Sequence, residues 1–438
     1  MTQIYIFLCH IDINARRSGT NNIKRKIYTD KIVRLLKSSK IIAEIGIRRS
    51  GKSYIAKQVI KELIDNGLDK YSTLIINLND ERLQKEEDIL NDIYNVYRKN
   101  IKKEGIAYII IDEAQEIEGW ERFVRGLTER NEARFILTGS SSKLLSSEYN
   151  TLLSGRHISI EITPLSFYEF LIFKGLDIKD KLDLASKHIE IQRYLEEYML
   201  YGGFPDVVLN DSKIELLNSY FDTIIVKDVI LRYNIRNPEK LRAIARYYLT
   251  NIGNPITYNR LARFTKIPLK TIERYTNYIE SSFSIFLVKR FSTSLKEQEN
   301  SPRKVYSIDN GLAIVNGFNM LDRGRLLENL VAIELKRRGK EFYYWTDTLT
   351  KKEVDFVVVN NDRSLDIIQV SYSINDPLTY EREVSAIETI SKRLRLNIKN
   401  RYIIVKELPN NEIIKDLYNK GIKIIDIVSF LLGYYIKS

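Results

Sequence analysis

Cysteine and histidine are almost absent from this chain. Among its 438 residues there is one cysteine, Cys9, and there are three histidines. A lone cysteine excludes a framework of disulfide bonds within the chain. So few cysteine and histidine side chains also argue against a structural zinc site. Stability is therefore expected to come from packed apolar cores.

Long apolar runs are missing too. No run approaches the roughly 18–20 residues that a membrane-spanning helix needs. The opening segment Ile4–Leu8 is apolar, but no basic stretch precedes it, and His10 and Asp12 soon interrupt it, so it fits a signal peptide poorly. The sequence therefore predicts a cytoplasmic protein without a membrane partner.

Acidic residues are outnumbered by basic ones. Lysine and arginine total 69, aspartate and glutamate total 57, and the formal net charge is +12. Hydrophobic residues make up 44% of the chain, which is enough for sizeable cores. The length suits two or three domains of roughly 100–200 residues each. The basic surplus favours an anionic partner such as DNA, although ordinary solvated lysines account for it equally well.

What the chain does contain is a glycine-rich loop between a strand pattern and a helix pattern. Ile41–Ile45 is a nearly continuous apolar run typical of a buried strand, and apolar residues recur at helical spacing over 56–64. Between them lies a complete GxxxxGKS motif, in which the expected nucleotide-binding residues are Gly46, Arg48, Arg49, Ser50, Gly51, Lys52 and Ser53. Such a loop directs backbone N–H groups and a helix N-terminus at phosphates. Lys52 would then contact the β- and γ-phosphates of ATP, and Ser53 would bind Mg²⁺.

Polar residues follow two further strand patterns. One apolar run ends in Asp112 and Glu113. Beside a phosphate loop, an aspartate at this position holds Mg²⁺, and the next glutamate can polarise the attacking water. The next strand pattern leads to Thr138 and Ser140, which are both candidates to sense the γ-phosphate. Capping of the following helix explains the same hydroxyl groups.

Short apolar runs alternate with helical patterns from residue 27 to about 163. The strand candidates are Ile41–Ile45, Leu74–Leu78, Ala107–Ile111, Arg134–Leu137 and Ile158–Ile162. Near-continuous apolar character is typical of strands that are buried on both faces of a parallel sheet. The sequence therefore predicts an α/β fold with a doubly wound parallel sheet in this part of the chain.

Residues 256–291 have a different character. Two helix patterns, Thr257–Phe264 and Leu269–Ile279, are separated by a turn and followed by the strand pattern Phe286–Phe291, an order typical of a winged helix. The polar run Ser292–Lys304 is expected to be a wing tip or a linker. The basic residues on or beside the two helices are Arg260, Arg263, Lys266, Lys270 and Arg274. Such a face suits a helix that enters a DNA groove, and a rigid adaptor without DNA contact stays open.

The last third of the chain places acidic residues in apolar surroundings. Glu328 lies on a helix pattern, Asp355 lies inside the strand pattern Val354–Val359, and Gln369 ends the next strand pattern. An aspartate in a buried strand is costly unless it is paired or binds a metal. The layout resembles the PD-(D/E)xK nucleases, whose carboxylates bind Mg²⁺. Because Ser371 stands where those nucleases have lysine, Glu328, Asp355 and Gln369 predict a degenerate metal site.

Together these segments resemble archaeal and bacterial AAA+-type ATPases that carry a C-terminal, nuclease-like domain of unknown function of the DUF4143 or DUF234 type. The motifs that carry the resemblance are GIRRSGKS, NLNDERL, IIIDEAQEIEGWE, FILTGSSSKLL, LLSGRHISIEITPLSFYEFL and YGGFPDVV. The resemblance implies that the acidic pair is the Walker B motif and that Ser140 is the sensor. It also implies that Arg156 is an arginine finger, which would reach a neighbouring subunit in a homo-oligomer. Gly203 and Pro205 resemble a lid element that closes over the nucleotide.

The predicted domains combine these residue patterns with the resemblance. They are an N-terminal extension (1–26), an AAA+ ATPase core (27–164), a helical lid (165–250), a winged helix (251–305) and a restriction-endonuclease-like α/β domain (306–438). We expect an enzyme that hydrolyses ATP with Mg²⁺ and couples hydrolysis to binding or remodelling of DNA. Two alternatives stay open. One is an ATP-dependent signalling or assembly switch without nucleic-acid chemistry, and the other is an ATP-gated nuclease with a degenerate active site.

Overall fold

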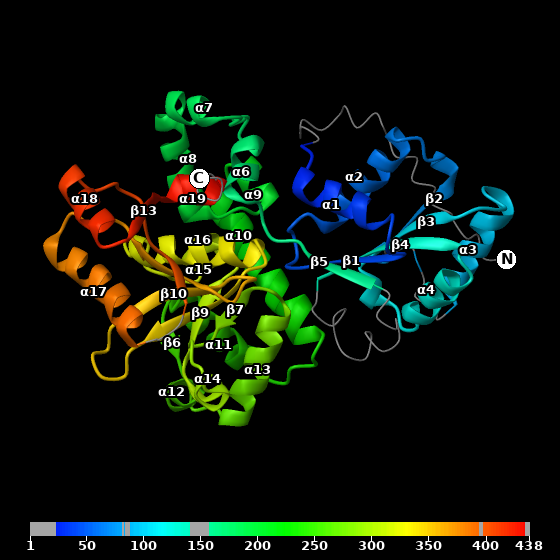
Figure 1. The fold of residues 1–438 in the computed structure, drawn as a ribbon. Helices are drawn as coiled ribbons and strands as arrows, with labels where there is room; N and C mark the ends of the chain where they lie inside the picture. Colours follow the sequence, from blue (N-terminus) through cyan, green and yellow to red (C-terminus); the bar gives the residue numbers. More distant parts are fainter. Residues whose placement is uncertain (1–22, 81–82, 84–87, 141–156, 394–396, 434–438) are drawn as a thin grey trace. The chain divides into compact units, whose positions relative to one another are not determined.

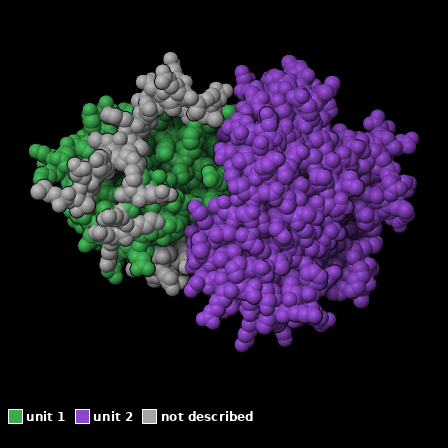
Figure 2. Space-filling view, turned by 180° about the vertical axis from the view of Figure 1, so that it is seen from behind, with its two compact units in different colours: residues 1–163, 281–283 green, residues 164–280, 284–438 purple. Residues whose placement is uncertain are grey.

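The computed structural model describes residues 23–80, 83, 88–140, 157–393 and 397–433. The chain divides into two compact units, coloured separately in Figure 2. The first unit comprises residues 1–163 and 281–283, and the second comprises residues 164–280 and 284–438. Among the helices of the described ranges, none combines the length and the apolar character that crossing a membrane requires.

The first unit is built on a five-stranded parallel sheet (Figure 1). Its strands are β1 (Ile41–Ile45), β2 (Thr73–Asn77), β3 (Ala107–Asp112), β4 (Ala133–Gly139) and β5 (His157–Glu161). They lie in the order β2-β3-β4-β1-β5, and every neighbouring pair is parallel. This is the order expected for a P-loop AAA domain. It brings the carboxyl ends of β1, β3 and β4 side by side at one edge of the sheet, where open α/β sheets bind ligands.

Helices cover both faces of this sheet. They are α1 (Lys26–Leu35), α2 (Lys52–Asp65), α3 (Ile89–Asn100) and α4 (Trp120–Glu129), with short 3₁₀ turns η1 (Lys70–Ser72) and η2 (Ala114–Glu116). Apolar residues of α1 and α2 pack on one face, and those of α3 and α4 pack on the other. Because both faces are covered, every residue of β1 is buried, which explains its nearly continuous apolar pattern.

The second unit begins with helices and continues into the region that the sequence predicts to be a winged helix. The first helices are α6 (Phe167–Phe173), α7 (Lys181–Ser186), α8 (His188–Tyr201), α9 (Pro205–Leu209), α10 (Lys213–Thr223), the π-helical η4 (Ile224–Leu231) and α11 (Pro238–Thr250). Next come β6 (Pro255–Ile256), α12 (Tyr258–Thr265), α13 (Leu269–Ser281), β7 (Ile285–Val288), α14 (Leu295–Asn300), β8 (Arg303–Ser307) and α15 (Asn310–Val315). The strands form a small antiparallel sheet in the order β6-β8-β7. The run expected to be a wing tip or linker therefore contains α14, and Lys304 lies in a strand.

The rest of the second unit is an α/β layer structure. It comprises α16 (Arg323–Arg337), β9 (Glu341–Thr346), β10 (Glu353–Val359), β11 (Leu365–Ser371), α17 (Pro377–Arg393), β12 (Ile398–Val405), α18 (Asn411–Asn419), β13 (Lys423–Asp426) and α19 (Ile427–Leu432). The sheet has the order β13-β12-β11-β10-β9, antiparallel from β9 to β11 and parallel from β11 to β13. α16 packs on one face and α17 on the other. One apolar core extends from α6 and α8 to α16 and this sheet, so the second unit is held together by shared packing.

Candidate functional site

The loop between β1 and α2 has the backbone shape that phosphate binding needs. Gly46, Arg49 and Gly51 have φ angles of 139°, 69° and 94°. A Cβ added at Gly46 would lie 2.3 Å from the carbonyl oxygen of Ile162, so only glycine fits there. Gly51 is the N-cap of α2, and no described side chain caps this helix end. The arrangement suits an anion at the start of the helix.

Two polar side chains of the loop fit a phosphate ligand. The Lys52 ammonium is buried and donates to the carbonyl oxygens of Gly46 at 3.0 Å and of Ile47 at 2.9 Å. These bonds hold the ammonium against the loop. The Ser50 hydroxyl is fully buried and has no hydrogen-bond partner within the described ranges. A buried ammonium and an unsatisfied hydroxyl on one loop are the donors that a polyphosphate would use.

Asp112 lies at the same edge of the sheet, at the end of β3. The Ser53 hydroxyl donates to Asp112 Oδ1 at 2.7 Å, and the Thr138 hydroxyl donates to the same oxygen. Thr138 is fully buried and also accepts a hydrogen bond from the backbone N–H of Glu113 at 3.0 Å. The structure thus brings Ser53 and Asp112 together, as the sequence predicts. A hydroxyl beside a carboxylate is a ligand pair that Mg²⁺ accepts.

Glu113 follows directly and is held in a strained backbone conformation, with a φ of 56°. Its Oε2 accepts a hydrogen bond from the Ser140 N–H at 3.3 Å and another from the side-chain amide of Gln115. Burial raises the pKa of Glu113, but the charges of Lys52 and Arg48 and these two hydrogen bonds lower it more. The net pKa lies below its usual value, so Glu113 is an ionised carboxylate at neutral pH.

The two sensor candidates have different partners. Thr138 contacts Asp112, whereas Ser140 contacts Glu113 through its backbone and accepts a hydrogen bond from Arg48 at its hydroxyl, at 3.4 Å. The predicted arginine finger, Arg156, lies outside the described residues. Pro205 begins α9 in the second unit, and its contact with nucleotide stays a prediction.

Two buried charged residues of the first unit were not predicted from the sequence. Arg25, in the predicted N-terminal extension, is 2% exposed and donates to the carbonyl oxygens of Ser50 at 2.7 Å and Thr163 at 3.1 Å. Glu44 in β1 is fully buried, and neither of its carboxylate oxygens has a hydrogen-bond partner in the described chain. Burial, with a contribution from Asp112, raises the pKa of Glu44 well above its usual value. A glutamate inside an apolar run was the available sequence signal for Glu44.

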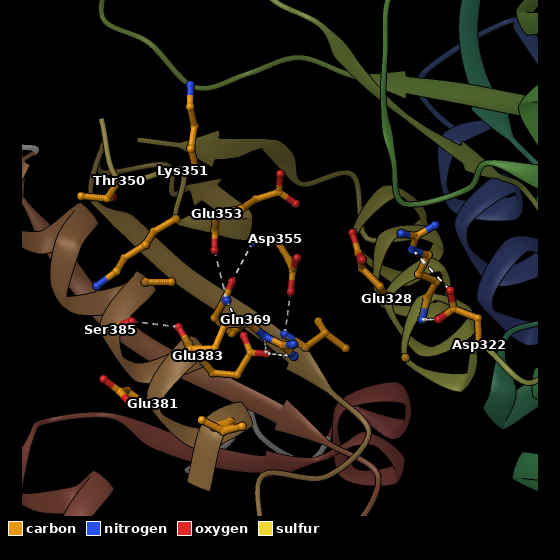
Figure 3. A pocket seen from close by; sticks show the side chains of 17 residues that line it. Asp322, Glu328, Thr350, Lys351, Glu353, Asp355, Gln369, Glu381, Glu383 and Ser385 are labelled. Atoms are coloured by element: carbon orange, nitrogen blue, oxygen red, sulfur yellow. Dashed lines mark hydrogen bonds and ion pairs between the residues drawn. The ribbon is translucent and has the colours of Figure 1, made fainter. Parts of the chain in front are cut away.

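The second unit has a pocket of about 790 Å³ that contains the three predicted residues of the degenerate nuclease-like motif (Figure 3). Glu328 comes from α16, Asp355 from β10 and Gln369 from β11. The pairing of β10 with β9 shifts register between Val354 and Val357, an interval that contains Asp355, and such bulges redirect side chains. The amide oxygen of Gln369 accepts a hydrogen bond from the Asp355 N–H at 2.7 Å. The predicted trio is therefore brought together.

The cation in this cluster is Lys304 of β8, which was not predicted from the sequence. Its ammonium lies 2.9 Å from Glu328, 2.7 Å from Glu353 and 3.4 Å from Asp355. Ser371, at the position where the nucleases have lysine, instead donates its hydroxyl to the carbonyl oxygen of Ser373 at 2.9 Å. In the described part of the chain, no three Asp, Glu, His or Cys side chains are arranged to hold a metal ion.

Family models match three successive parts of the chain. Residues 38–171 match an AAA domain, residues 192–321 match the domain of unknown function DUF8612, and residues 323–428 match the domain of unknown function DUF4143. Among solved structures, a Walker-type ATPase of Pyrococcus abyssi is 15% identical, with a TM-score of 0.42, covering 67% of this chain and 95% of that one. The ORC1 protein of Aeropyrum pernix, solved in complex with DNA, is 12% identical, with a TM-score of 0.31, covering 67% and 91%.

Two relatives match over most of their length. The uncharacterized protein MJ1544 of Methanocaldococcus jannaschii is 35% identical over 398 residues, which are 87% of this chain and 85% of the relative. An uncharacterized protein of Haemophilus influenzae is 30% identical over 423 residues, which are 94% of this chain and 98% of the relative. The chain therefore belongs to the family of these two proteins, in which an AAA domain is followed by DUF8612 and DUF4143.

Proposed function

We propose that this protein is a Mg²⁺-dependent ATPase whose nucleotide lies on the loop Gly46–Ser53. The observation that carries the proposal is the Ser53 hydroxyl on Asp112, with the adjacent Glu113 held by the Ser140 N–H. The carboxyl ends of β1, β3 and β4 would then provide, in this order, the phosphate loop, the metal ligand with its neighbouring carboxylate, and the N–H that holds this carboxylate.

Each side chain has a role in this proposal. Ser53 and Asp112 would hold the metal, and Lys52 would leave its carbonyl partners to neutralise phosphate charge. A bound magnesium ion supplies positive charge that stabilises the transferring phosphoryl group. Glu113 would orient a water molecule and accept its proton, which requires the ionised form that its lowered pKa provides.

ATP turnover by the Glu113→Gln variant tests the proposal. The substitution keeps the size of the side chain but removes the base, so we expect ATP affinity to be retained and turnover to fall about 10²–10⁴-fold. The matched control is Glu118→Gln, an exposed glutamate five residues away, which should turn over ATP at the wild-type rate. Wild-type turnover by Glu113→Gln, or wild-type ATP binding by Lys52→Ala, would contradict the proposal.

We further propose that the helices α12 and α13 contact DNA. The exposed residues on these helices and in the turn between them include Arg260, Arg263, Lys266, Lys270 and Arg274. Phe264 is 73% exposed beside them, and one exposed acidic residue, Glu273, lies on the same helix pair. A cationic face with an exposed aromatic ring suits phosphate contacts and base stacking.

The salt dependence of DNA binding measures this contact. If Lys270 binds a phosphate, Lys270→Gln should weaken binding to all sequences and reduce the slope of log affinity against log salt by about 1. Lys415→Gln removes an exposed lysine of α18 and should leave the slope unchanged. Absence of DNA binding at moderate salt would instead favour the signalling or assembly switch. In that case, light scattering with and without ATP would detect a change in assembly.

A further inference from the structure

Six carboxylate side chains line the pocket of the second unit, and four of them carry the argument that follows. Glu353 and Asp355 come from β10, Glu328 from α16 and Glu383 from α17, and Figure 3 shows them converging on the pocket. Like charges this close repel one another and lose hydration on burial. Accordingly, burial and the charge of Glu328 raise the pKa of Asp355 well above its usual value. Arg382 pairs with Glu383 at 2.6 Å, so Glu328, Glu353 and Asp355 are the carboxylates that need a further cation.

Lys304 supplies that cation from the interior. It is 1% exposed, and it is not among the residues that line the pocket, so it approaches the carboxylates from the protein side. An ammonium has three N–H donors, and three carboxylates lie within 3.4 Å of it. Burial lowers the pKa of Lys304, but Glu328 and other neighbours raise it more, so the group stays charged.

One oxygen of Glu328 and both oxygens of Asp355 already face donors of the protein. Glu328 Oε1 accepts hydrogen bonds from Lys304 at 2.9 Å and from the Tyr306 hydroxyl at 2.6 Å. Asp355 Oδ2 accepts one from the Val370 N–H at 2.9 Å, and Oδ1 faces Lys304. These oxygens are therefore oriented toward protein donors.

The orientation of the Gln369 side chain leaves its amide oxygen unavailable as a metal ligand. Its amide oxygen accepts from the Asp355 N–H, and its amide nitrogen donates to Glu383 Oε2 at 2.5 Å. Turning the amide over would place its oxygen against the Glu383 carboxylate and its nitrogen against a backbone N–H, both of which are repulsive. Gln369 thus offers its donor, and no oxygen, to the carboxylate cluster.

We propose that the Lys304 ammonium occupies the place of a divalent cation among Glu328, Glu353 and Asp355, so that the wild-type pocket takes no metal. Removing the ammonium would leave a carboxylate site of the kind that Mg²⁺ and Mn²⁺ prefer. The inference is independent of the ATPase proposal. It argues against the nuclease alternative, because metal-assisted phosphodiester hydrolysis needs a cation that the lysine excludes.

A Mn²⁺ titration of the full chain without nucleotide tests the proposal. Electron paramagnetic resonance of the free ion measures how much Mn²⁺ is bound. Lys304→Met keeps most of the side-chain length but removes the charge. It should bind one Mn²⁺ per chain at least about tenfold more tightly than any site of the wild type. The double variant Lys304→Met/Asp355→Asn should lose that site. Lys352→Met, which removes a lysine from the rim of the same pocket, should behave like the wild type.

Thermal unfolding gives a second readout, because Lys304→Met leaves buried carboxylates without a cation. Mn²⁺ should raise the unfolding temperature of this variant and leave that of the wild type unchanged. Wild-type Mn²⁺ binding that disappears in Asp355→Asn would overturn the proposal, since the cluster would then be a metal site beside a lysine. Failure of Mn²⁺ either to bind or to stabilise Lys304→Met would overturn it as well.

Discussion

Replacing Glu44 should make the first unit more stable. Glu44 is the fourth of the five residues of β1, in register with Thr138 of β4 and Ile160 of β5, and it is fully buried. Neither carboxylate oxygen has a hydrogen-bond partner in the described ranges. Burial and the charge of Asp112 raise the pKa of Glu44, while Lys52 and other cations only partly oppose this. The carboxylate is therefore held at a cost.

That cost gives the expected magnitude. A buried polar group without a partner costs about 1–3 kcal/mol, and Glu44→Met removes the polar atoms while keeping a similar side-chain volume. We therefore expect the unfolding free energy of the first unit to rise by about 1–3 kcal/mol at pH 8. Because burial raises the folded-state pKa of Glu44, its protonated form favours the folded state. This stabilisation is fully present below the usual pKa of 4.5 and is lost as the pH rises through the folded-state pKa. The advantage of methionine should thus be smaller at pH 5 than at pH 8.

The two tryptophans make the assay specific. Trp120 is buried in the core of the first unit, and Trp345 lies in the second, so a Trp345→Phe background leaves one reporter for the first unit. Urea unfolding at pH 5 and pH 8, without nucleotide, gives the free energies. Glu44→Gln, which keeps polar atoms but no charge, should fall between wild type and Glu44→Met. If Glu44→Met is less stable than wild type at pH 8, the reasoning is refuted, because the carboxylate must then be stabilised by a cation.

Three other substitutions test contacts in the two units, one in the first and two in the second. Arg25→Met removes the guanidinium that holds the Ser50 carbonyl, and should weaken ATP binding about tenfold by calorimetry, whereas the exposed Arg34→Met should not. Asp309 is buried, and burial raises its pKa to about 7, so its contribution to stability should decline between pH 5 and pH 8. Urea unfolding of Asp309→Asn, compared with wild type, should show a stability difference that shrinks over this range. Gly202→Ala places a Cβ 1.9 Å from an oxygen of Asp309 at a φ of 72°, and should lower the unfolding free energy of the second unit by at least about 2 kcal/mol in circular dichroism.

Local motifs were sufficient to predict that Ser53, after the loop of β1, meets Asp112 at the end of β3. Ser53 and Asp112 are 59 residues apart, yet their contact was predictable because parallel strands bring their carboxyl ends to one edge. Continuous apolar runs similarly predicted the five strands, since a sheet covered on both faces needs them. In both cases the signal is local in sequence, and general rules of sheet packing supply the long-range step.

Arg25 could not be predicted in this way. Its hydrogen bonds reach Ser50 and Thr163, which are 25 and 138 residues away, and all three lie in different elements or loops. No periodicity relates these positions, because a buried arginine between two backbone carbonyls depends on the final packing of α1 against the sheet. Glu44 was visible in the sequence as a charged residue that interrupts an apolar run. The sequence does not show whether the folded structure provides this carboxylate with a hydrogen-bond partner.

Lys304 and Ser371 show why a motif can mislead about charge. Read along β11, the substitution of serine for lysine removes the positive charge that a nuclease-like site would need. The structure restores a positive charge at the carboxylates, but from β8, a strand that belongs to the small three-stranded sheet. A positive charge near the carboxylates does not by itself restore metal-assisted hydrolysis. On β11 the lysine would accompany the glutamate position in the same strand, whereas Lys304 meets the carboxylates from within the protein and takes up the oxygens that a metal would bind. The function of this pocket therefore depends more on the position of the positive charge relative to the carboxylates than on which residue occupies the motif position.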